Sequence, residues 1–143
     1  MNKLFFIGTN ASSSLGNEIV VALKGTSEGG AQIQVGVQTP ANWGAGTRNG
    51  FYEANANQPG FSLGRWHLIE VHVVQNLGGL PNGKLTWWVD GVMVGRHTNV
   101  LFNANGDAMF DYMILDPNWG GQGSPTKAQR DWIRVDHLLV TGR

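Results

Sequence analysis

The chain has 143 residues, no cysteine and a formal net charge of zero. This length fits one domain that can bury a core. The lack of cysteine excludes disulfide frameworks, thiolate metal sites and cysteine nucleophiles. Charged residues make up only 14% of the chain, so no strong field attracts nucleic acid or an anionic membrane, and we expect neither as a partner.

Runs of β-branched and aromatic residues, bounded by Gly, Asn and Pro, predict strands in the first part of the chain. These runs are residues 3–7, 18–24 and 31–38. In the third run, Ile33, Val35 and Val37 alternate with glutamines, which predicts one apolar and one polar face. Residues 39–63 are rich in Gly, Asn and Ala and predict long loops, with one short strand at 50–53.

The second half repeats the strand signal, and no segment shows a convincing helical period. The pair Asp90–Gly91 lies between two apolar runs and predicts a tight hairpin. A glycine-rich loop is predicted at 118–127. The predicted strands of this half are residues 66–75, 84–89, 92–96, 108–115 and 132–140. About nine strands without helices predict an all-β, antiparallel domain of two packed sheets or a barrel.

Two stretches of the second half carry a family resemblance. They are GRWHLIE at residues 64–70 and NGKLTWWVDG at residues 82–91. They resemble a strand of the form G-x-W-H-x-x-E and a hairpin of the form N-G-x-x-x-x-W-x-D-G in the concanavalin A-like lectin/glucanase superfamily, chiefly its polysaccharide-lyase-like and laminin G-like sandwiches. The ending WIRVDHLLV, at residues 132–140, resembles the final strand of that group.

The resemblance implies one two-sheet jelly-roll β-sandwich over residues 1–143. Domains of this kind usually carry further strands before the segment that resembles residues 3–7. The sandwich is then a reduced version, or a missing segment or a neighbouring chain completes it. Because an uncovered sheet edge invites pairing, self-association is a further expectation.

Alternation along the predicted strands places a set of polar and aromatic side chains on the outer face of one sheet. In the resembling family, sugar chains lie on such a concave face. A pyranose presents hydroxyl groups to polar partners and an apolar C–H face to an aromatic ring. The open alternative is a solvated face with an ion pair from Arg134 to Asp136 or Glu70. The candidate ligand-binding residues of this face are Glu70, His72, Trp88, Arg134 and Asp136.

Two tryptophans, Trp43 and Trp119, fall in predicted loops, where a large exposed ring needs a reason. They are either platforms at the rim of a sugar site or lids over the open ends of the sandwich. We assign Trp66, Trp87 and Trp132 mainly to packing.

Catalysis has weaker support from the sequence. A retaining glucanase needs two carboxylates about 5 Å apart. Glu70 is followed at alternate positions by His72 and Val74, so the second carboxylate is missing. A lyase needs a base and a group that neutralises a uronate carboxylate. If the chain is a lyase, the candidate catalytic residues are His72, Tyr112 and Arg134.

Metal sites are weakly indicated. Asn103, Asn105 and Asp107 place oxygen ligands at alternate positions, as a calcium loop does, and a plain Asn–Gly turn explains them equally well. We expect His67 and His137 to lie on apolar faces as satisfied histidines, and no histidine pair has metal-ligand spacing.

The sequence therefore favours a protein that binds a polysaccharide without chemistry and needs no cofactor, calcium being the one candidate ion. Two alternatives stay open: a structural or decoration module of a larger assembly such as a phage particle, and a polysaccharide lyase. We expect an extracellular or particle-surface location, although the start of the chain, MNKLFFIGTN, shows no signal peptide.

Overall fold

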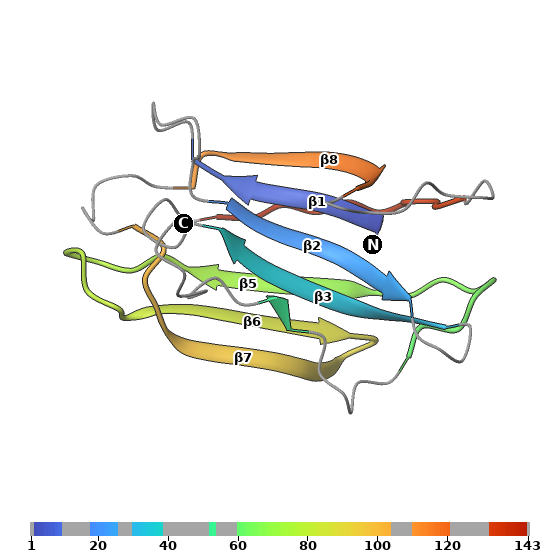
Figure 1. Cartoon of the computed structure of the whole chain (residues 1–143), viewed down its shortest axis with the longest axis horizontal. Coiled ribbons are helices and arrows are strands. Elements are labelled where there is room, and N and C mark those ends of the chain that lie inside the picture. The colour runs from blue at the N-terminus through green and yellow to red at the C-terminus, as the bar shows by residue number, and fades with distance from the viewer. Residues whose placement is uncertain are drawn as a thin grey trace.

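The computed structural model describes residues 2–9, 18–25, 30–38, 52–53, 60–103, 110–120 and 132–142. These residues form eight strands in two antiparallel sheets (Figure 1). They contain no helix, and hence none with the length and apolar character needed to cross a membrane. The prediction of an all-β, two-sheet fold is confirmed.

The larger sheet has five strands in the order β4-β3-β2-β1-β8. Its register pairs Ile19 with both Ile7 and Val37, so apolar side chains of neighbouring strands lie side by side. The strands are β1 (Asn2–Gly8), β2 (Glu18–Gly25), β3 (Ala31–Gln38), β4 (Tyr52–Glu53) and β8 (Tyr112–Trp119). The predicted strands in the first part of the chain are confirmed.

The smaller sheet has three strands in the order β5-β6-β7. They are β5 (Ile69–Val74), β6 (Gly83–Val89) and β7 (Val92–Val100). Asp90 and Gly91 connect β6 to β7 and both have positive φ, 50° and 77°. Two central residues with positive φ match the right-handed twist of the flanking strands, as in a type I′ turn, which confirms the predicted hairpin.

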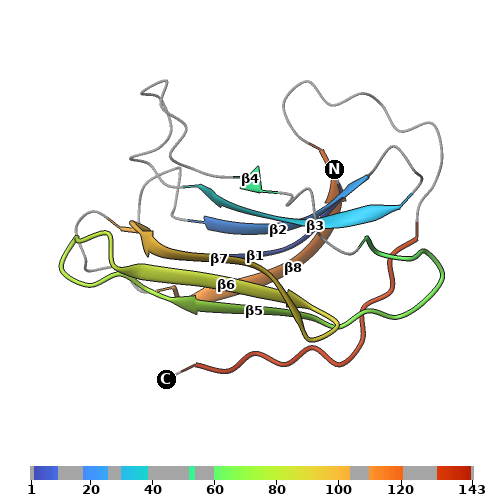
Figure 2. The ribbon, with the colours of Figure 1, turned by 90° about the horizontal axis from the view of Figure 1, so that it is seen from below.

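The two sheets lie in separate layers (Figure 2), and one apolar cluster joins them. Ile19, Ile33 and Val35 from the larger sheet are fully buried, as are Leu85 and Trp87 from the smaller one. The predicted apolar face of β3 is therefore the core face. The arrangement is sandwich-like.

The edge strand β8 contains a proline inside a bulge. Lys3 pairs with Asn118 and Phe5 with Leu115, so Leu4 alone lies opposite Asp116 and Pro117. A proline is tolerated here because an edge strand does not need every N–H for pairing. The prediction of a strand at 108–115 followed by a loop from 118 is wrong in position, since β8 runs from Tyr112 to Trp119.

A buried asparagine joins the end of β5 to the end of β7. Asn76 is fully buried, and its amide donates to the Asn103 carbonyl oxygen at 2.8 Å. Its side-chain oxygen accepts hydrogen bonds from the N–H groups of Phe102 and Asn103 at 2.9 and 3.0 Å. These three bonds fix the chain where it leaves β7.

The predicted closing strand at 132–140 does not form. The structure assigns no strand to these residues, which run as a separate extended segment with most side chains exposed. A physical reason lies in His137, whose φ of 53° breaks the extended conformation that a strand requires.

Candidate functional site: the outer face of the three-stranded sheet

Alternate side chains of β5 and β6 share the outer face of the smaller sheet. On β5, Glu70 and His72 are exposed, while their neighbours Ile69, Val71 and Val73 turn towards the core. The register pairs Glu70 with Trp88 and His72 with Thr86. Because directly paired residues point to the same side of a sheet, these four side chains form two adjacent rows.

Strand β7 extends both rows. Trp88 pairs with Met93, and Thr86 pairs with Arg96. The half-buried indole of Trp88 therefore lies between a carboxylate and an exposed thioether side chain, in the middle of the sheet. The second row places His72 and Arg96 on either side of Thr86. The outer face thus offers one aromatic surface surrounded by hydrogen-bonding groups of both charges.

A second tryptophan continues this face beyond the start of β5. Trp66 is 63% exposed and Leu68 is also exposed, while His67 between them turns inward against Phe61. The alternation of β5 therefore continues to Trp66, on the side of Glu70. Assigning Trp66 mainly to packing was wrong. The alternation that placed Glu70 and His72 together also included Trp66 and could have identified it as a site residue.

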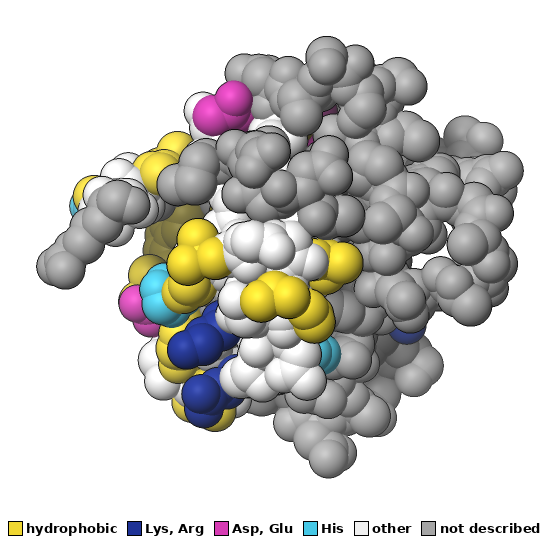
Figure 3. Space-filling model, turned by 90° about the vertical axis from the view of Figure 1, so that its left-hand side faces the viewer, with side chains coloured by type: hydrophobic (Ala, Val, Ile, Leu, Met, Phe, Trp, Pro, Cys, Tyr) yellow, Lys and Arg dark blue, Asp and Glu magenta, His cyan; other side chains and the backbone are white. Residues whose placement is uncertain are grey.

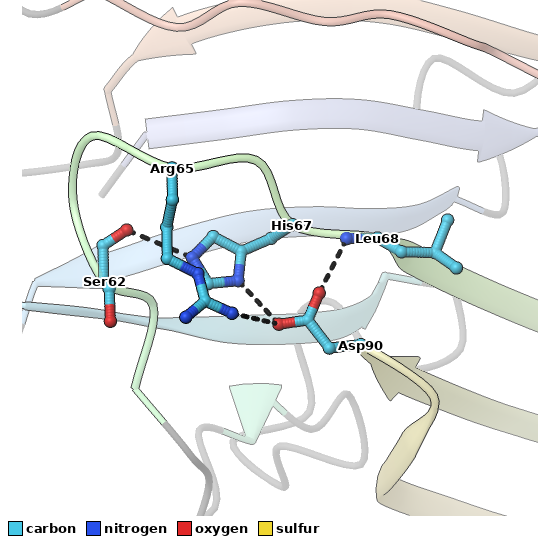
Figure 4. A network of polar contacts seen from close by, with 5 residues as sticks. All are labelled: Ser62, Arg65, His67, Leu68 and Asp90. Atoms are coloured by element: carbon cyan, nitrogen blue, oxygen red, sulfur yellow. Dashed lines mark hydrogen bonds and ion pairs between the residues drawn. The ribbon is translucent and has the colours of Figure 1, made fainter.

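A network of polar contacts holds this end of the face (Figure 4). Asp90 Oδ2 lies 2.8 Å from His67 Nδ1 and 3.5 Å from an Arg65 guanidinium nitrogen. The backbone of Leu68 donates to Asp90 Oδ1 and accepts from the Asp90 N–H, each at 2.9 Å. The β6–β7 turn is thereby tied to the segment that carries Trp66.

Both ring nitrogens of His67 have oxygen partners. The Nδ1 faces Asp90 Oδ2, and the Nε2 lies 3.1 Å from the Ser62 carbonyl oxygen. The hydrogen bond from His67, and then that from the Leu68 N–H, lower the pKa of Asp90 below its ordinary value of 3.8. His67 is therefore a satisfied histidine, as predicted, and it belongs to the frame of the face.

No family model matches this chain. No curated protein and no solved structure matches it either. What the outer face can do must therefore be argued from its own residues.

The structure brings together three of the five residues predicted for the sheet face. Glu70, His72 and Trp88 share it. Arg134 and Asp136 lie in the exposed segment that forms no strand, and neither makes a hydrogen bond or ion pair to the other three. Their predicted place on the sheet is not observed, because that place depended on residues 132–140 pairing as a strand.

The other tryptophans also differ from expectation. Trp119 is the last residue of β8 and is 40% exposed, so it lies on the larger sheet and outside the predicted loop. Trp132 is 84% exposed, so its assignment to packing was wrong, while Trp87 is fully buried as predicted. Trp43 lies outside the described residues. His137, predicted on an apolar face, is exposed and contacts Asp136.

The three lyase candidates lie on three separate elements. His72 is on β5, Tyr112 begins β8 of the other sheet, and Arg134 is in the exposed segment. Burial and the hydrogen bond that the Tyr112 hydroxyl donates to Glu18 raise the pKa of Tyr112. A raised pKa opposes formation of the phenolate that a tyrosine base needs. The structure does not assemble a base beside a carboxylate-neutralising group from these residues.

The candidate calcium loop lies mostly outside the described residues, which include Asn103 but neither Asn105 nor Asp107. Within the part that is described, the Asn103 backbone bonds to Asn76. No group of three or more metal-binding acidic, histidine or cysteine side chains occurs among the described residues.

Proposed function

We propose that the outer face of β5, β6 and β7 binds an extended carbohydrate chain without catalysing a reaction. The observation that carries this proposal is the position of Trp88, half-buried at the centre of the face and flanked by Glu70 and Met93. An aromatic ring carried by a rigid sheet can stack on a pyranose at low entropic cost. The surrounding carboxylate, imidazole and guanidinium supply partners for hydroxyl groups.

The fold we propose for this activity is a jelly-roll sandwich of the concanavalin A-like kind. Two antiparallel sheets around a shared core support that proposal. The exposed Trp66 lies further along the same face and provides a second stacking surface. Two aromatic surfaces on one face favour a chain of several sugar units over a single sugar.

The test is affinity electrophoresis of the full chain in gels that contain neutral or uronate-bearing polysaccharides. We expect one class of polymer to retard the protein and Trp88→Ala to abolish the retardation. The matched control is Phe6→Ala, which removes a half-buried aromatic side chain from β1 on the other sheet and leaves retardation unchanged. Retardation by no polymer, or equal retardation of both variants, rejects the proposal.

A second proposal is a structural module of a larger assembly. It is supported by the apolar loop between β5 and β6, where Leu77 is 70% and Leu80 59% exposed. Figure 3 looks at this end of the molecule and shows apolar side chains gathered next to basic ones. Adjacent exposed leucines on a loop indicate a protein contact.

This second proposal predicts self-association through the loop. Light scattering coupled to gel filtration should give an oligomer for the native chain and a monomer for the Leu77→Ser, Leu80→Ser double variant. A monomer for both chains contradicts self-association through this loop.

A further inference from the structure

The extended segment 132–142 lies on the β5 side of the three-stranded sheet. In both Figure 1 and Figure 2 it runs in the same direction as β5. Within the described residues, its backbone makes no hydrogen bond to another segment; the only one is from the His137 N–H to the side chain of Asp136. Ile133 is half-buried against the core, while Val135 and Leu139 are exposed, the latter by 83%.

Strand β5 is an edge strand of the smaller sheet, and its core-facing side chains are incompletely covered. Ile69, Val71 and Val73 face the core and yet are only half-buried, whereas Leu85 and Trp87 on the neighbouring strand are fully buried. Strand β5 pairs with β6 alone, so the N–H and C=O groups of its outer edge have no strand partner among the described residues. An edge with free backbone groups and incompletely covered apolar side chains can accept another strand.

We propose that residues 132–140 dock along this edge as a fourth strand parallel to β5, with Arg134 beside Glu70 and Asp136 beside His72. Ile133 already contacts the core, which sets the inward face of the segment. By alternation Val135 and Leu139 then cover the open core, and Arg134 and Asp136 point to the outer face. In this register Arg134 meets a carboxylate and Asp136 meets an imidazole, which is the charge complementarity that selects it.

The contact between Asp136 and His137 holds the segment in its undocked form. The Asp136 carboxylate accepts from the His137 N–H at 2.8 Å and lies 3.2 Å from its Nδ1. These contacts stabilise a left-handed residue, φ 53°, which a strand cannot contain. Docking returns His137 to the extended region and frees the Asp136 carboxylate for His72.

The consequence for ligand binding rests on the proposed function. Docking adds Arg134 and Asp136 to the face that already carries Glu70, His72 and Trp88. Arg134 then supplies a planar guanidinium with several donors next to the Trp88 row, which suits adjacent sugar hydroxyls or a uronate carboxylate. The two residues become specificity-determining residues of the same face.

Hydrogen exchange of the full chain, without any ligand, tests the docking itself. The two informative variants are His137→Val, whose β-branched side chain disfavours positive φ, and His137→Gly, which permits it. We expect amides in residues 133–139 and on the outer edge of β5 to exchange about tenfold more slowly in His137→Val than in His137→Gly. Equal, unprotected exchange of the segment in both variants overturns the proposal.

A charge exchange tests the register. In the His137→Val protein, Arg134→Glu should remove the protection of the segment from exchange. Adding Glu70→Arg to that variant should restore the protection. If the protection is not restored, this register is wrong. Polysaccharide binding is scored separately. If the segment is protected from exchange but no polymer retards the protein in the gel, the carbohydrate function is rejected and docking stands. If a polymer retards the protein but the segment of His137→Val is not protected, docking is rejected and the carbohydrate function stands.

Discussion

The indole ring of Trp87 covers Gly95, its register partner on β7, so closely that a β-carbon at position 95 would overlap the ring. His97 stacks on the same indole, with ring centroids 5.7 Å apart. Trp87 is fully buried, so it cannot move aside without disturbing the core between the sheets. The absence of a side chain at position 95 thus fixes how β6 and β7 pack.

Gly95→Ala should therefore destabilise the protein by about 2–3 kcal/mol, because a methyl group has no room beside the indole. Urea unfolding followed by tryptophan fluorescence measures the change. The control is Gly120→Ala, where a β-carbon meets nothing within 4 Å, and we expect a change of under about 0.5 kcal/mol. Equal effects of the two substitutions would contradict the packing described here.

Acid should weaken the fold partly through Asp90. Its pKa is lowered in the folded state by the hydrogen bonds from His67 and the Leu68 N–H, so it stabilises the fold when ionised. That contribution is fully present above the unfolded value near 3.8 and is lost as the pH falls through the lower folded value. Asp90→Asn should flatten the dependence of unfolding free energy on pH below about pH 4. An unchanged pH dependence of the unfolding free energy in Asp90→Asn would contradict this contribution.

Asn76→Ala should cost roughly 3 kcal/mol, because it removes the side-chain oxygen that accepts from the N–H groups of Phe102 and Asn103. Thermal and urea unfolding measure the loss. Asn99→Ala is the matched control, since that side chain is exposed and bonds, among the described residues, only to Thr98; its effect should be within about 0.5 kcal/mol. A cost for Asn76→Ala no larger than the control would show that these bonds are dispensable.

Local patterns were enough to predict much of the fold. The alternation at Ile33, Val35 and Val37 placed β3 and its core face correctly, and Asp90–Gly91 placed the hairpin. Both signals depend only on neighbours in the sequence. The end of β8 was missed because residues 118 and 119 were assigned to the glycine-rich loop, whereas β8 continues to Trp119 through a bulge that accommodates Pro117.

In the candidate site too, local patterns placed some residues correctly and a distant pairing left another misplaced. Glu70 and Trp88 were placed together because the faces of β5 and β6 follow from alternation. Arg134 was misplaced because its position depends on whether a distant segment pairs with β5, which alternation alone does not determine. The left-handed conformation of His137 accompanies a hydrogen bond from its N–H to the Asp136 side chain, which strand alternation does not indicate.

The proline in β8 has a consequence for how copies of this chain behave at high concentration. Strand β8 ends the five-stranded sheet among the described residues, and Pro117 interrupts its outer rim at an exposed bulge. A neighbouring molecule that approaches this rim finds a missing donor and a bent backbone, so continuous growth of sheets into fibrils is disfavoured from that side.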